Sequence, residues 1–153
     1  MDRRHCNRSN ISTCRLCSVG MLEDCNHLFF SSPFSARCWN KIGIQWKLTV
    51  DLKDIIIHAR NSFRGPAFML IFTCATWHIW KQRNDLVFDR EPYSFRRWFI
   101  CFRQELVYHY PKLKENIRLA ISDWLNLIDN SLSYSFFQKK TLMKAWTSSQ
   151  LIC

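Results

Sequence analysis

Apolar residues recur at helical spacing along most of this chain. Ser32 and Pro33 are typical of a helix start, because serine caps the first turn and proline fits the first helical position, so a helix is predicted over residues 33–42. A second helix is predicted after Asp51, with Asp54 three residues on as its capping partner. One face of that helix would carry Ile55, Ile56, Ala59 and Phe63.

Longer helical patterns follow the break at residues 64–66. The first extends to about Phe88 and is apolar on all sides up to Trp80, which predicts a position at the centre of a helical assembly. The second begins near Phe95 and repeats apolar residues until Pro111, namely Phe95, Trp98, Phe99, Phe102 and Leu106. The third carries one stripe made of Leu113, Ile117, Ile121, Trp124, Leu125 and Ile128. No alternation of period two is long enough to require a sheet.

These patterns divide the chain into three expected segments. Residues 1–47 are expected to form a small irregular Cys/His module, and residues 48–130 a region of four to five helices. Residues 131–153 are expected to be a weakly ordered tail, in which residues 136–146 are a candidate short helix. The expected fold class is therefore mainly α.

The composition supports a folded core and gives the chain a strongly basic character. Of 153 residues, 48% are hydrophobic and 15% aromatic, which excludes disorder of the whole chain. The net charge of +10 is spread along the sequence, so only the fold could gather it into a patch. Such a charge points to nucleic acid, an anionic membrane or an acidic partner.

The sequence favours neither a membrane span nor secretion. The most apolar stretch, residues 66–80, is fifteen residues long, whereas a spanning helix needs about 20 apolar residues. The basic start MDRRHCNRSN is not followed by an apolar region, so no signal peptide is expected. We expect an intracellular protein, nuclear or cytoplasmic, without a transmembrane helix.

The cysteines indicate a local metal site. Five of the eight cysteines fall within the first 38 residues, which favours a reducing compartment over a disulfide scaffold. Cys14 and Cys17 have the Cys-x2-Cys spacing that can direct two sulfurs at one ion, and His27 follows within reach of a folded loop. Because zinc prefers thiolate and imidazole ligands in a tetrahedral arrangement, zinc is the expected cofactor.

The same stretch resembles a known family. Its pattern, C-x2-C…H-L-F-F-x-x-P-F-S-x-x-x-W, resembles the zinc-binding domain of plant LINE-type (non-LTR) retrotransposon reverse transcriptases. The later segment TWHIWKQRNDLVF, residues 76–88, is similar to a segment often found downstream in the same elements. The matching positions of the first segment are Cys14, Cys17, Glu23, His27, Leu28, Phe29, Pro33, Phe34 and Trp39.

The chain departs from that family at one ligand. The resemblance implies a fourth cysteine where this chain has Ser32, and a neutral hydroxyl is a poor zinc ligand. Cys25, two residues before His27, is the candidate replacement. Cys38 is roughly 9 Å along the helix from Ser32 and is not expected to reach. The segment before the first cysteine is short compared with the family, so the module is expected to be truncated at its N-terminus.

No catalytic constellation accompanies the module. Nucleotidyl transfer needs carboxylates that hold two metal ions about 4 Å apart, and the sequence has no Asp-Asp pair. We therefore expect a non-catalytic remnant of a reverse transcriptase polyprotein, with RNA or DNA as its partner and no small-molecule substrate. The alternatives are a helical protein-interaction module, which could self-associate, and a translated pseudogene fragment without selected function.

The candidate nucleic-acid contacts lie on the longer helices. They are Lys81, Arg83, Arg96, Arg97 and Arg103. Trp77, Trp80 and Asn84 share one side of a helix, where they could stack on bases. Buried aromatic residues at helical spacing are usually core, so a core seam is the expected role of this side, and a solvated helix face is the expected role of the arginines.

Overall fold

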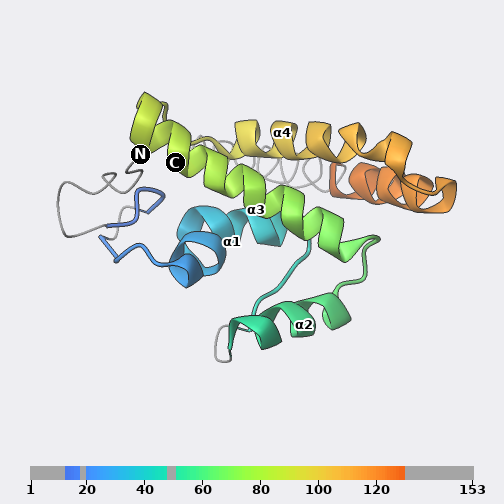
Figure 1. Ribbon diagram of the computed structural model, residues 1–153, viewed down its shortest axis with the longest axis horizontal. Coiled ribbons are helices and arrows are strands. Elements are labelled where there is room, and N and C mark those ends of the chain that lie inside the picture. The colour runs from blue at the N-terminus through green and yellow to red at the C-terminus, as the bar shows by residue number, and fades with distance from the viewer. Residues whose placement is uncertain (1–12, 18–19, 48–50, 130–153) are drawn as a thin grey trace, which may run out of the picture. The chain divides into compact units, whose positions relative to one another are not determined.

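The computed structural model describes residues 13–17, 20–47 and 51–129, and the expected tail and candidate helix at 136–146 lie outside them. Within these ranges the protein is mainly helical and contains no strand, which confirms the expected fold class (Figure 1). A single isolated bridge pairs Thr13 with Leu22.

Helix α1 (Pro33–Lys41) starts as predicted. The hydroxyl oxygen of Ser32 accepts a hydrogen bond from the backbone N–H of Ser35 at 3.1 Å, and Pro33 occupies the first helical position. Gly43, with φ of +73°, allows the chain to leave the helix in the left-handed conformation. The buried face of α1 carries Phe34, Ser35, Cys38 and Trp39.

Helix α2 (Leu52–Ser62) also begins where predicted, but without the predicted cap. Asp51 occupies the N-cap position, and its side chain makes no capping hydrogen bond. Ile55 and Ala59 are buried, whereas Ile56 and Phe63 are only half-buried. The helix is therefore held by its apolar face rather than by a side-chain cap.

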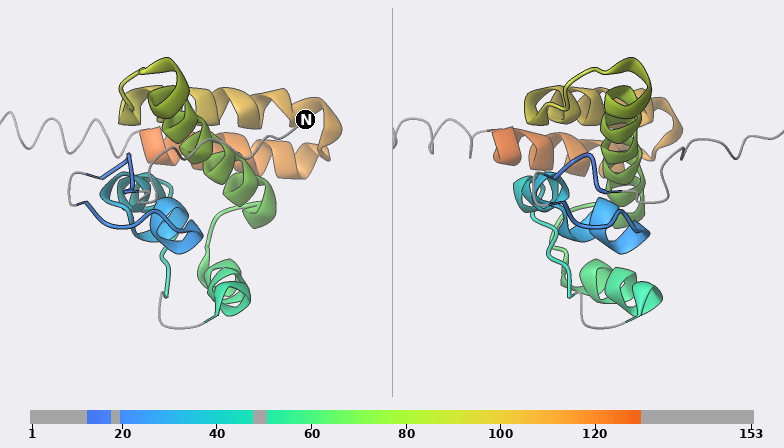
Figure 2. Two further views of the ribbon diagram at one scale, coloured as in Figure 1. Left: turned by 60° about the vertical axis from the view of Figure 1, so that its left-hand side comes forward. Right: turned by 90° about the vertical axis from the view of Figure 1, so that its left-hand side faces the viewer.

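Helix α3 (Phe68–Asn84) contacts α1 and α4, as Figures 1 and 2 show. The predicted continuous helix to Phe88 instead ends in a wider π-helical turn, η2 (Asp85–Asp89), which Arg90 closes with φ of +57°. The buried side of α3 consists of Phe68, Ile71, Cys74, Ala75, His78, Ile79 and Gln82. No helix in the described ranges is both long and apolar enough to cross a membrane.

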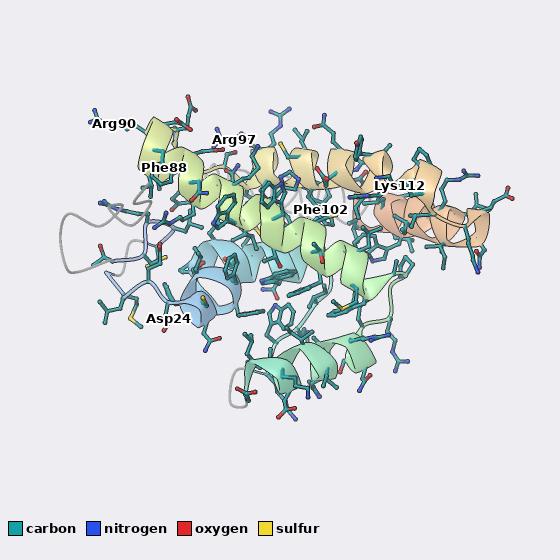
Figure 3. All side chains as sticks on the ribbon, in the orientation of Figure 1. Asp24, Phe88, Arg90, Arg97, Phe102 and Lys112 are labelled. Carbon is teal, nitrogen blue, oxygen red and sulfur yellow. The ribbon has the colours of Figure 1, made fainter. Side chains whose placement is uncertain are left out.

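Helix α4 (Phe95–Tyr108) packs against α3 and buries its apolar side there. Ser94 caps it by accepting from the N–H of Arg97, and a short 3-10 turn, η3 (Tyr110–Lys112), follows it. The indole N–H of Trp98 donates to the carbonyl of Ala75 in α3 at 3.3 Å. The predicted stripe is buried at Trp98, Phe99, Phe102 and Leu106, and Figure 3 labels Phe102.

The Cys/His segment and the first helices belong to one compact unit. The chain divides into units Met1–Leu113 and Lys114–Cys153, so both lie in the first unit. Within this unit, Trp39 of α1 stacks on Phe72 of α3 with ring centroids 5.9 Å apart. The second unit contains a helix over residues 115–129.

Candidate metal centre

The loop before α1 brings Cys14 and Cys17 together. The N–H of Cys14 donates to the carbonyl of Met21 at 2.8 Å, which closes the loop directly beside the Thr13–Leu22 bridge. The Cys17 sulfur lies 3.7 Å from the Cys14 carbonyl oxygen, so the chain turns tightly between the two cysteines. This turn is the local structure that the Cys-x2-Cys spacing predicted.

His27 is held by the π-helical turn η1 (His27–Ser31) that precedes α1. The backbone N–H of His27 donates to a carboxylate oxygen of Asp24 at 2.6 Å, and the N–H of Ser32 donates to the His27 carbonyl at 2.7 Å. Figure 3 labels Asp24 on this part of the chain. The two bonds fix the backbone on either side of the imidazole, which limits the directions the ring can take.

The imidazole faces the cysteines. Its Nε2 atom lies 3.4 Å from the Cys17 sulfur, and its Nδ1 atom lies 3.2 Å from the hydroxyl of Ser31. Histidines that bind metals usually engage their second nitrogen in a hydrogen bond that orients the ring. Ser31 is placed to make that bond while Nε2 stays directed at the thiols.

Cys14, Cys17 and His27 form one group that could hold a metal ion, and we call it the metal group. One ligand atom from each residue lies within 4.8 Å of the other two. Zinc bonds of about 2.0–2.3 Å place tetrahedral ligand atoms roughly 3.5 Å apart, so the metal group needs only a small contraction to fit zinc. The fold thus assembles the three predicted ligands.

The electrostatics of the metal group suit a cation. Burial, with a smaller contribution from the nearby Cys17, raises the pKa of the Cys14 thiol to about 11. A thiolate in this position is therefore unfavourable by itself, whereas a bound cation supplies the charge that stabilises it. Metal binding and thiol deprotonation would occur together.

The three residues considered at the fourth-ligand position lie in different environments. Cys25 is exposed, and its sulfur is not among the atoms of the metal group. Ser32 is fully buried, and its hydroxyl oxygen caps α1 and lies 2.9 Å from the hydroxyl of Ser35. Cys38 is buried in α1, where burial raises its pKa. Among the described residues, the side chains that could serve as ligands here are therefore the three of the metal group.

An ion pair that the sequence did not reveal joins residues 13–17 and 20–23, here called the metal loop, to α3. Arg83 donates from Nε at 3.0 Å and from Nη2 at 2.7 Å to the same carboxylate oxygen of Glu23. The Arg83 side chain is 21% exposed and the Glu23 side chain 10% exposed. Both residues lie in the segments that carry the family resemblance, but nothing in their separate spacings predicts a contact across sixty residues.

The five basic candidates lie in different environments. Arg83 is engaged by Glu23, and Arg97, labelled in Figure 3, lies 3.4 Å from a Glu91 oxygen and 3.7 Å from an Asp85 oxygen. Lys81 and Arg96 are exposed. Arg103 is half-buried beside a shallow hollow lined by Ile100, Arg103, Gln104 and Val107.

The tryptophans of α3 differ from expectation. Trp77 and Trp80 are 49% and 41% exposed, so they are not a core seam. The reason is the direction of the helix, because α1 and α4 cover the sides that carry Ile71, Ala75 and Ile79.

Comparison of the chain with protein-family models, curated proteins and solved structures found no match.

Proposed function

We propose that this chain is a non-catalytic nucleic-acid-binding protein that holds one zinc ion through Cys14, Cys17 and His27. The observation that carries the proposal is the convergence of the three ligand atoms within 4.8 Å. We assign the fourth position to a solvent molecule, because Cys25 lies outside the metal group and the Ser32 hydroxyl is engaged in capping α1.

The role of zinc in this proposal is structural. A bound zinc ion would link the Cys14–Cys17 turn to the π-helical turn that carries His27. No strand ladder supports the loop, since its backbone pairing in the described residues is the Cys14–Met21 bond with its neighbouring bridge. The metal would therefore supply stability that the loop otherwise lacks.

The case for nucleic acid rests on charge and on the resemblance. The chain carries a net charge of +10, and Lys81 and Arg96 are exposed on α3 and α4. The module resembles the zinc-binding domain of LINE-type reverse transcriptases, and we propose that the chain derives from such a polyprotein. The Glu23–Arg83 pair supports this origin, because it joins the two segments that carry the resemblance.

Salt dependence of binding tests the proposal. Fluorescence anisotropy of a labelled 20-nucleotide RNA or DNA would be followed at several salt concentrations, with zinc-loaded protein and with Cys14→Ser. Phosphate contacts release counterions, so the logarithm of the affinity should fall linearly with the logarithm of the salt concentration. The Cys14→Ser variant should bind more weakly at every salt concentration. Affinity that is absent, or that does not change with salt, would overturn the proposal.

A further inference from the structure

The exposed side of α3 carries a preassembled pair of aromatic rings. Trp77 and Trp80 stack on each other with centroids 5.0 Å apart and an angle of 27° between the ring planes. They remain 49% and 41% exposed, although tryptophan is usually largely buried. Two large rings held together on the solvent side of a helix form a surface on which a further flat ring can stack.

Polar groups suited to nucleic acid flank this pair. Lys81 is exposed and follows Trp77 by four residues, so it lies on the same side of α3. Asn84 follows Trp80 by four residues, and its side-chain oxygen accepts from Arg83 at 3.3 Å. The amide nitrogen, which is a donor, is therefore the end directed away from Arg83. We call Trp77, Trp80, Lys81 and Asn84 the tryptophan face.

Two acidic residues at the C-terminal end of α3 are paired with arginines. Glu23 is paired with Arg83, and Asp85 lies 3.7 Å from a guanidinium nitrogen of Arg97. The charge that the tryptophan face presents is thus that of Lys81, on a chain whose net charge is +10. An anionic ligand with flat apolar rings complements both properties.

We propose that the tryptophan face binds single-stranded nucleic acid by stacking unpaired bases on Trp77 and Trp80, with Lys81 contacting phosphate. The inference rests on the proposed function and identifies the substrate class and the surface. Single strands are selected because the flat faces of bases are covered by their neighbours in a duplex, while an unpaired base exposes them.

The test compares a labelled 12-nucleotide single strand with a blunt duplex of the same sequence. The variants are Trp77→Ala/Trp80→Ala and, as a matched control, Met69→Ala, because Met69 is a comparably exposed apolar residue of the same helix. Stacking is worth about 1–3 kcal/mol per base, so the double variant should bind the single strand about tenfold more weakly or worse. Its affinity for the duplex and its zinc content should stay unchanged. The single strand should also quench tryptophan fluorescence of the wild-type protein, and Met69→Ala should behave as wild type.

The contradicting outcomes are distinct. Salt-dependent binding that is equal for both nucleic acids and unaffected by the double variant would overturn this inference and leave the proposed function standing. Absence of any binding by the wild-type protein would overturn both. A wild-type dimer in light scattering that becomes monomeric in the double variant would assign the tryptophan face to a second copy of the chain instead.

Discussion

Arg83 and Glu23 join the C-terminal end of α3 to the metal loop through two N–H donors on a single carboxylate oxygen. The other oxygen of Glu23 is buried and has no hydrogen-bond partner within the described part of the chain. The carboxylate therefore depends on Arg83 for its compensation. This pair couples the stability of the metal loop to the helix that carries the tryptophan face.

Removing Arg83 should destabilise the protein more than removing the whole pair. Arg83→Met leaves a largely buried, uncompensated carboxylate, so the free energy of unfolding should fall by about 3 kcal/mol. Glu23→Leu/Arg83→Met removes both charges and should lie closer to the wild-type protein. Urea unfolding of the zinc-loaded variants measures this, and equal losses for the single and double variants would contradict the coupling.

Substitutions of the neighbouring residues Ser31 and Ser32 should separate the loss of the α1 cap from the loss of metal binding. Ser32→Ala removes the α1 cap and should lower the free energy of unfolding by about 1–2 kcal/mol while zinc affinity is retained. Ser31→Ala removes the hydroxyl beside Nδ1 of His27 and should weaken zinc binding roughly tenfold with little effect on stability. Competition with a zinc chelator and urea unfolding check the two effects. Loss of zinc affinity in Ser32→Ala alone would mean that Ser32 is itself a ligand.

Ala67 is held in a conformation that favours glycine. Its φ of +46° lies in the left-handed region, which costs a residue with a side chain roughly 1–2 kcal/mol. Because glycine loses more backbone entropy on folding, Ala67→Gly should raise the stability by only about 0.5 kcal/mol. The control Ala75→Gly, at a buried position within α3, should lower stability by about 1 kcal/mol or more. Thermal unfolding measures the sign of the stability change in both variants. A lower midpoint for Ala67→Gly than for the wild-type protein would contradict the prediction.

The buried His78 should make stability depend on pH. Burial lowers its pKa from 6.5, although Glu105, 3.7 Å away, acts in the opposite direction. The unfolded chain then takes up a proton before the folded one does, so stability should be full above pH 6.5 and fall as the pH drops below it. His78→Gln should show a shallower decline in urea unfolding between pH 7 and pH 5. A decline as steep as that of the wild-type protein would assign the effect to other groups.

Periodicity predicted α1 and α4 well because each has one apolar face that packs against neighbouring helices. The start of α1 at Pro33 and the buried stripe of α4 follow from local rules that need no knowledge of the tertiary fold. The all-round apolar sequence of α3 was misleading. It contains more apolar surface than α1 and α4 cover, and Trp77 and Trp80 are left outside. Only the packing of the neighbouring helices decides which side is buried.

The metal group, like the helices, was predictable in part from the sequence. The spacing of Cys14, Cys17 and His27 identified the three residues that converge. The Glu23–Arg83 pair and the burial of Ser32 were not accessible, since each depends on where separate segments meet in space. The stacking of Trp39 in α1 on Phe72 in α3 was not accessible for the same reason.

Zinc content per chain is the measurement that tests the central claim most directly. Protein purified under reducing conditions with zinc in the medium would be analysed by elemental mass spectrometry. We predict one zinc per wild-type chain, none in Cys14→Ser, and one in both Cys25→Ser and Cys101→Ser, because Cys14 is the one of these three cysteines that belongs to the metal group. A wild-type chain without zinc, or a Cys14→Ser variant that retains it, would contradict the account.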